Sequence, residues 1–209
     1  MENKIIDAYM NYVLENGEQP ASVYAFAKKL KIKEGEFYQY FSSFEAIEND
    51  FAMKKFYSII ETLNADTEIY GKYGAEEKFS ALLYSWTQTL RDNRSFVQFL
   101  EKKEHMAKPI PGYFKSLKED FHKWADSILA EGIENNEVVS RQFISDRYAD
   151  ALFLQFTFIH KFWLKDNSKD FEKTDAAIEK SVRLAFDLIG QSAFDSALDF
   201  GKFIFSNRS

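Results

Sequence analysis

Residues 22–47, SVYAFAKKLKIKEGEFYQYFSSFEAI, decide the fold of this chain. The start of this stretch carries the i, i+3, i+4, i+7 spacing of one buried helical face, on Val23, Phe26, Ala27 and Leu30. Residues 31–33 follow as a turn, and a second helix is predicted over 34–41, with Phe37 and Phe41 facing inward. Two short helices joined by a tight turn form a helix-turn-helix unit, which usually lays its second helix in the major groove of DNA.

Helices are also predicted on both sides of this unit. Residues 2–16 place apolar side chains on one face, and Gly17 is a natural helix end. Ser22 is the predicted N-cap of the helix that follows. The segment Ser42-Ser43-Phe44-Glu45 matches the capping-box pattern and opens a fourth helix, which is expected to run to about residue 63.

The remainder of the chain shows helical periodicity and no strand-like alternation of useful length. Residues 64–74 are polar with two glycines and are interpreted as a linker. Further helices are expected near 75–91, 94–106, 112–135, 143–165, 174–190 and 193–206. The predicted fold class is therefore all-α.

The composition limits the function classes. The chain has 209 residues, a formal net charge of −6 and no cysteine, which excludes disulfides, cysteine-ligated zinc and cysteine nucleophiles. It shows neither the pattern of a secretory signal nor a run of about 18 apolar residues, so we expect a cytoplasmic protein without a membrane span. Because the whole molecule is acidic, any DNA contact must come from a local patch.

The helix-turn-helix residues resemble the head of TetR-type transcriptional regulators. The matching positions, with their spacing intact, are Ala27, Leu30, Ile32, Gly35, Phe37, Tyr38, Tyr40, Phe41, Ser43, Glu45 and Ile47. The resemblance implies a TetR-like fold, with an N-terminal three-helix head over residues 1–48 and a helical ligand-binding and dimerisation body over 49–209. It also implies a DNA-binding regulator, most often a repressor, and not an enzyme.

The predicted DNA-binding residues lie in the head. They are Ser22, Lys28, Lys31, Lys33, Glu36, Tyr38, Gln39 and Tyr40. The lysines suit phosphate contacts, although a solvated helix face is the alternative interpretation. Two positions depart from the family pattern. Phe44 stands where a phosphate-binding lysine is usual, and Glu36 stands where a small hydroxyl residue is usual. Glu34 adds a second carboxylate, and like charge weakens the approach to phosphate, although Glu can accept a hydrogen bond from cytosine.

Aromatic residues are frequent in the body, and a subset is expected to line an apolar cavity between helices. The predicted ligand-binding residues are Trp86, Phe99, His105, Tyr113, Phe121 and Trp124, with His105 or His122 as a polar handle. His160 is expected to be a hydrogen-bonded core histidine. Glu119 and His122 give one Glu-x-x-His, but a di-metal bundle needs a second copy, so no metal and no cofactor are predicted.

The predicted helices over 143–165 and 174–190 are apolar on more than one side. Such a helix is either central in its own subunit or shared with a partner, and this pattern supports a homodimer through a four-helix bundle. The preferred hypothesis is a dimeric regulator that binds a double-stranded DNA operator and an unknown apolar small-molecule effector, without a catalytic constellation. The alternative is a protein of the same fold that binds a lipid or another apolar ligand and does not bind DNA.

Overall fold

The computed structural model describes residues 1–103, 109–141 and 147–190, and within these ranges every regular element is a helix. This confirms the predicted all-α class. The α-helices are α1 (Glu2–Asn16), α2 (Val23–Leu30), α3 (Glu34–Phe37), α4 (Phe44–Ala65), α5 (Ala75–Arg91), α6 (Arg94–Lys103), α7 (Leu117–Glu134), α8 (Tyr148–Lys165) and α9 (Glu172–Ile189). Short 3₁₀ turns are η1 (Tyr70–Lys72), η2 (Gly112–Phe114) and η4 (Lys169–Phe171).

The chain packs as two compact units. The first consists of Met1–Ile59 and Gln88–Lys118, and the second of Ile60–Thr87 with the described residues from Glu119 onward. The first unit is therefore discontinuous in sequence. It contains α6, which packs against α1 although it follows α5 in the chain.

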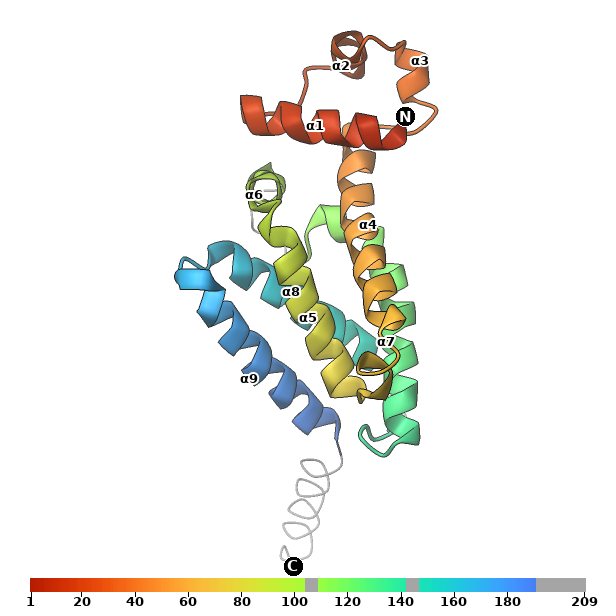
Figure 1. Ribbon diagram of the computed structural model, residues 1–209, viewed down its shortest axis with the longest axis vertical. Coiled ribbons are helices and arrows are strands. Elements are labelled where there is room, and N and C mark those ends of the chain that lie inside the picture. Colours follow the sequence, from red (N-terminus) through yellow and green to blue (C-terminus); the bar gives the residue numbers. More distant parts are fainter. Residues whose placement is uncertain (104–108, 142–146, 191–209) are drawn as a thin grey trace, which may run out of the picture. The chain divides into compact units, whose positions relative to one another are not determined.

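The head of the first unit is α1, α2, α3 and the first turns of α4, which Figure 1 shows gathered together. Two predicted caps are confirmed. Gly17 ends α1 in the left-handed region at φ 71°, and its N–H donates to the Val13 carbonyl at 2.8 Å. The Ser22 Oγ accepts from the Ala25 N–H at 3.1 Å and so caps α2. Tyr9, Phe26 and Phe37 are buried in the head and bury large apolar areas.

The second helix of the helix-turn-helix is shorter than predicted. The prediction of a helix over 34–41 is wrong in its second half, because α3 ends at Phe37. The backbone after Phe37 forms a tight turn. The N–H of Gln39 donates to the carbonyl of Glu36 at 3.3 Å, and the N–H of Tyr40 donates to the carbonyl of Phe37 at 3.0 Å. These i→i−3 hydrogen bonds form a 3₁₀-type turn, which is tighter than an α-helical turn, and the side chain of Phe41 after it is buried in the core. The inward orientation predicted for Phe37 and Phe41 is confirmed.

The N-cap of α4 also differs by one residue from the prediction. The helix begins at Phe44, and its exposed amides are capped by Ser43, whose Oγ accepts from the Ala46 N–H at 3.1 Å. The predicted capping box from Ser42 to Glu45 is therefore wrong. Because Ser43 is the cap, Phe44 becomes the first helical residue and its side chain can turn into the head.

The second unit is built on α5, α7, α8 and α9. Its buried side chains include Phe79, Trp86, Phe121, Phe153, Phe156 and Trp163. The predicted linker over 64–74 is an ordered part of this unit, because it contains η1 and the buried side chain of Tyr70. At the other end of the unit, Asp166 accepts hydrogen bonds from the N–H and hydroxyl groups of Ser168 and Thr174 and fixes the connection from α8 to α9.

The body helices agree with the predicted ranges where they are described. The helix expected near 112–135 is a 3₁₀ turn followed by α7, and the one expected over 143–165 is described from Tyr148. The end of the helix expected over 94–106 and all of that expected over 193–206 lie outside the described residues. Within the described part of the chain, no helix is long and apolar enough to cross a membrane.

Candidate DNA-binding surface and ligand-binding body

Most of the predicted DNA-binding residues are exposed to solvent; they lie on α2, in the turn after it, and just beyond the end of α3. Lys28, Lys31, Lys33 and Gln39 are exposed. The tyrosine side chains are also accessible, since Tyr38 is 51% exposed and Tyr40 is 43% exposed. Between residues 22 and 40 the chain carries four lysines and two glutamates, so this segment is locally basic on an acidic protein. This is the local patch that contact with a polyanion requires.

The lysines also have a structural reason for their positions. Lys28 and Lys29 lie in the last turn of α2, where positive charge complements the helix dipole. Lys31 ends the helix in the left-handed region at φ 58°, and its N–H donates to the Lys28 carbonyl at 3.1 Å. Such a conformation turns the chain sharply and so sets the direction of α3.

Two of the predicted DNA-binding residues act within the protein as helix caps. The Ser22 side chain caps α2, and the Glu36 Oε2 accepts from the Lys33 N–H at 2.7 Å at the start of α3. Glu36 is half-buried and held in this position. The carboxylate that departs from the family pattern therefore stabilises the second helix of the helix-turn-helix. The other carboxylate, Glu34, lies 3.5 Å from the Tyr38 hydroxyl, which is long for a hydrogen bond.

Phe44 occupies the position of the family's usual lysine and is part of the head core. Its ring stacks on Tyr9 at 5.1 Å with an interplanar angle of 11°, and meets Phe26 edge-on at 5.5 Å. A side chain packed in this way is not available to a phosphate. The sequence analysis did not select Tyr24, which lies on α2 and is among the exposed large side chains. Its place on the outer face of an amphipathic helix was the available signal.

The predicted ligand-binding residues are divided between the two units. Trp86 and Phe121 both contact Phe156 in the second unit, and Trp124 joins this cluster through Phe121. The ring centroids lie at 4.8 Å for Trp86–Phe156, 5.1 Å for Phe121–Phe156 and 5.6 Å for Phe121–Trp124. Trp86 and Phe121 are buried completely, so this cluster is packed rather than open.

The other predicted ligand-binding residues are not in that cluster. Phe99 and Tyr113 belong to the first unit, where the Tyr113 hydroxyl donates to the Glu101 Oε1 at 3.0 Å. His105 lies outside the described residues. His122 lies on α7, with its Nε2 3.4 Å from the Asp150 Oδ1.

His160 supplies the polar group of the aromatic cluster. It is fully buried on α8, and the Trp86 Nε1–H donates to its Nδ1 at 3.1 Å, so its remaining proton is on Nε2. Burial lowers the pKa of the His160 imidazole to about 3, with Lys161 adding to the effect. The imidazole is therefore neutral at physiological pH, and the prediction of a hydrogen-bonded core histidine is confirmed.

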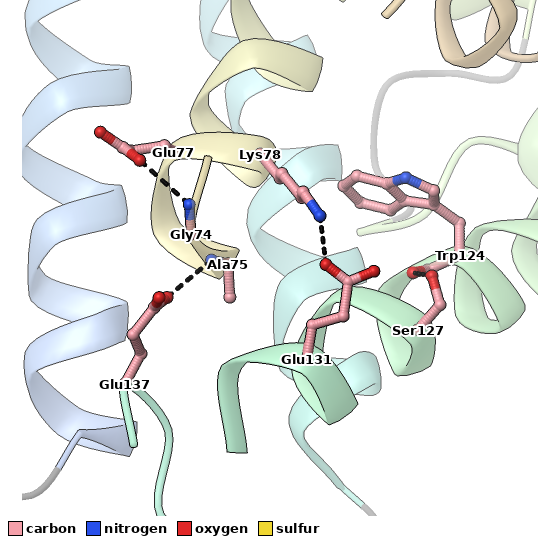
Figure 2. Close-up of polar contacts among 8 residues, drawn as sticks. All are labelled: Gly74, Ala75, Glu77, Lys78, Trp124, Ser127, Glu131 and Glu137. Carbon is pink, nitrogen blue, oxygen red and sulfur yellow. Dashed lines mark hydrogen bonds and ion pairs between the residues drawn. The ribbon is translucent and has the colours of Figure 1, made fainter. Parts of the chain in front are cut away.

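A solvent-accessible cavity of about 650 Å³ lies elsewhere in the second unit, at the start of α5. Four acidic residues line it, Glu76, Glu77, Glu137 and Asp187, together with Lys72. Figure 2 shows two of these carboxylates at backbone amides: the Glu137 Oε2 accepts from the Ala75 N–H at 2.7 Å, and the Glu77 Oε2 from the Gly74 N–H at 3.0 Å. These carboxylates cap α5, so the acidic lining has a structural explanation.

One ion pair connects two helices of the second unit: Figure 2 shows Lys78 of α5 paired with Glu131 of α7. Another ion pair lies within α7, where Glu119 pairs with Lys123 at 2.8 Å. Among the described residues, no group of three or more His, Asp or Glu side chains is placed to hold a metal ion.

Comparison with known proteins identifies the family. Residues 78–204 match the family described as tetracyclin repressor-like, C-terminal domain. The transcriptional regulator FadR from Bacillus subtilis, solved in complex with stearoyl-CoA, is similar with a TM-score of 0.64 and 20% identity over 89% of this chain and 98% of that chain. A protein of unknown function from Rhodococcus sp. RHA1 is similar with a TM-score of 0.57 and 12% identity over 91% of this chain and 95% of that chain. No curated protein matches the chain.

These similarities agree with the helix-turn-helix head and the helical body. At these identities the solved structures show a shared fold, whereas the family match covers more than half of the 209 residues. The family consists of transcriptional regulators and not of enzymes. The chain belongs to the tetracyclin repressor-like family of transcriptional regulators.

Proposed function

We propose that this protein is a dimeric, ligand-responsive repressor that binds a double-stranded DNA operator. Residues 1–48 contact DNA in this proposal, and residues 49–209 bind an apolar small molecule and form the dimer. The observation that carries it is the exposed surface from the end of α2 to residue 40, in which Lys28, Lys31 and Lys33 precede the short helix α3 and two exposed tyrosines follow it. The mechanism is a population shift, in which the ligand favours a state whose two heads no longer match successive grooves.

The lysines and the tyrosine–glutamine segment have different tasks in this proposal. Lys28, Lys31 and Lys33 neutralise phosphates, which supplies affinity without sequence preference. Tyr38, Gln39 and Tyr40 lie beyond the end of α3, where side chains can approach base edges or phosphates. Ser22 and Glu36 keep their capping roles and place the two helices.

The ligand is proposed to be apolar because the second unit is built on aromatic side chains with few polar groups among them. Trp86 and Phe121 pack on Phe156, Trp124 packs on Phe121, and His160 is a buried polar residue bonded to Trp86. The stearoyl-CoA in the FadR complex supports a ligand with a long acyl chain. Since the cluster is closed in this structure, entry of such a ligand requires its side chains to move apart.

The homodimer is supported by apolar side chains that remain exposed on α8 and α9. Leu154 and Phe158 are one helical turn apart on α8, and Leu184 and Leu188 are one turn apart on α9; each is more than half exposed. These two helices pack together, with the Gln155 Nε2 donating to the Ser181 Oγ at 3.0 Å. Two such pairs would bury these side chains in a four-helix bundle.

The dimer is tested by sedimentation of Phe158→Glu. A charge at a buried dimer contact should convert the protein to a monomer without unfolding it, because Phe158 is outside the core of the monomer. Ile69→Glu is the matched control, since Ile69 is equally exposed and lies outside α8 and α9. A Phe158→Glu protein that remains dimeric would refute this interface.

DNA binding is tested by fluorescence anisotropy with a duplex from the region upstream of the protein's own gene. The wild type should bind it, with affinity falling as salt rises. Lys31→Gln and Lys33→Gln should each lower the slope of log K against log salt by about 1. Lys169→Gln, an exposed lysine in η4 of the second unit, is the control and should leave the slope unchanged. The absence of binding at low salt by the folded protein would refute DNA recognition.

A second candidate function is binding of a lipid or other apolar ligand without DNA recognition. The buried position of Phe44 and the carboxylate of Glu34 favour it, because they remove one phosphate contact and add a repulsive charge. Native mass spectrometry separates the two functions, since the second candidate predicts a co-purified ligand in a protein with no DNA affinity. Glu34→Gln adds a test that spares the Glu36 cap: it should raise nonspecific DNA affinity only if the surface approaches DNA.

A further inference from the structure

A buried carboxylate joins three helices of the first unit. Glu48 lies on α4, one turn after Phe44, and is 3% exposed. Its Oε1 accepts from the hydroxyl of Tyr9 on α1 at 2.5 Å. The Nζ of Lys103, the last residue of α6, donates to the Glu48 Oε1 at 2.9 Å and to the Oε2 at 2.8 Å. Both oxygens of this carboxylate therefore have donors.

The surroundings of Glu48 make its partners important. The Tyr9 ring stacks on Phe44 and meets Phe96 of α6 edge-on at 6.2 Å, so the carboxylate lies at the edge of an aromatic core. Burial, together with the hydrogen bond to Glu48, raises the pKa of the Tyr9 hydroxyl above its usual value, so this group stays a donor. A charge in such a place is stable only while it is paired, and removal of one partner leaves it unsatisfied.

The position of α6 in the chain connects this contact to the second unit through the backbone. The helix follows α5 directly, and the residues of α5 up to Thr87 belong to the second unit. α6 itself packs on α1 in the first unit, through Phe96 near its start and Lys103 at its end. A shift of α5 is thus carried by the backbone into a helix that is fastened to the head.

We propose that Glu48, Tyr9 and Lys103 form an ionic latch by which α6 holds the head in its DNA-competent arrangement. The inference rests on the proposed DNA-binding function. While the Lys103 ammonium is bonded to Glu48, it holds α6 against α4 and α1. A ligand-driven shift of α6 moves the ammonium away from Glu48. The head then rearranges so that the Glu48 carboxylate reaches solvent or another hydrogen-bond donor. Lys103 and Glu48 are positioning residues, since they act on the DNA surface through α1 and α4.

The test compares wild type, Glu48→Gln, Lys103→Met and Lys103→Arg, with Lys102→Met as the matched control. Lys102 precedes Lys103 in α6 and is exposed. The duplex is the one from upstream of the protein's own gene, and stearoyl-CoA is the ligand probe. Glu48→Gln and Lys103→Met should bind the duplex about tenfold more weakly than wild type without the probe, and addition of the probe should change their affinity less than twofold. Lys103→Arg should restore most of the wild-type affinity, and Lys102→Met should match wild type.

Hydrogen exchange gives a second readout that needs neither DNA nor ligand. Loss of the Glu48–Lys103 contact in Glu48→Gln and Lys103→Met should accelerate hydrogen exchange of the backbone amides of α1–α3. The amides of α8 and α9 should exchange at their wild-type rates. If wild type does not bind the duplex, the proposed function fails, and exchange alone decides on the latch. Unchanged head exchange in both variants overturns the latch in every case. Wild-type affinity of both variants for the duplex overturns it as well, even if wild type binds DNA as proposed.

Discussion

The neutral histidine in the core of the second unit should make the stability of this protein fall in mildly acidic solution. The pKa of His160 is about 3 in the folded protein, against 6.5 for the ordinary group. Because the folded pKa is lowered, the full contribution to stability is present above 6.5 and is lost as pH falls through 6.5 toward 3. Between pH 6.5 and pH 5 the His160 imidazole is protonated in the unfolded chain but stays neutral in the folded chain. At about 1.4 kcal/mol per unit, the loss is about 2 kcal/mol.

The assay is urea unfolding at pH 7 and pH 5, followed by tryptophan fluorescence. Two reporters lie beside the imidazole, since the ring centroids of Trp86 and Trp163 are 6.0 Å and 6.4 Å from that of His160. His160→Gln keeps an acceptor for the Trp86 indole but cannot be protonated in this range. It should therefore lose about 2 kcal/mol less than wild type between the two pH values.

A control without a histidine change separates this effect from general acid sensitivity. Lys169→Gln changes an exposed residue of η4 that is outside the hydrogen bond to Trp86, so its loss of stability between the two pH values should equal that of wild type. If His160→Gln and wild type lose the same free energy of unfolding between pH 7 and pH 5, the imidazole is not held neutral by folding, and the reasoning is refuted.

Three further predictions concern local packing and caps, each measured as the free energy of urea unfolding. Asp166→Ala should cost about 2 kcal/mol, because it removes four hydrogen bonds. Burial raises the pKa of the Asp166 carboxyl, but the four hydrogen bonds have the larger effect and lower this pKa to about 2. In wild type, the contribution of Asp166 to the free energy of unfolding should therefore disappear as pH falls from 3.8 toward 2. Phe44→Ala should cost about 3 kcal/mol or more, and Phe44→Lys should destabilise the head without adding a DNA contact; a stable Phe44→Lys protein with higher DNA affinity would contradict the packing argument. Gly17→Ala should cost about 1 kcal/mol because φ is 71°, whereas Gly35→Ala, with open space around its Cβ position, should be neutral or stabilising.

The sequence was sufficient for the elements whose signals are local. The predicted ranges 2–16 and 75–91 equal α1 and α5, because each has regular apolar spacing and a clear end. The end of α3 was not predictable in this way, because the tight turn after Phe37 depends on Phe41 entering a core formed by distant helices. Local propensity gives no information about that requirement.

The candidate site shows the same division between local and distant information. Exposure of the lysines and tyrosines followed from their places on helix faces and in the turn. By contrast, the assignment of Phe99 and Tyr113 to the first unit could not be inferred, since it depends on the packing of α6 against α1 and on the hydrogen bond from Tyr113 to Glu101 of α6. The cap formed by Glu36 was missed because a carboxylate in a proposed reading helix was judged only by its charge toward DNA.

The discontinuous first unit has a consequence for chimeric regulators. The N-terminal helices do not form this unit alone, because Phe96 from α6, a helix that begins at Arg94, packs on Tyr9 of α1 and Phe51 of α4. A graft that ends at Ala65 would remove Phe96 from its contacts with α1 and α4, and would leave Glu48 without the Lys103 ammonium. A chimera that is to keep the packing of the first unit, and with it the proposed DNA-binding surface, therefore requires exchange of α6 together with the first four helices.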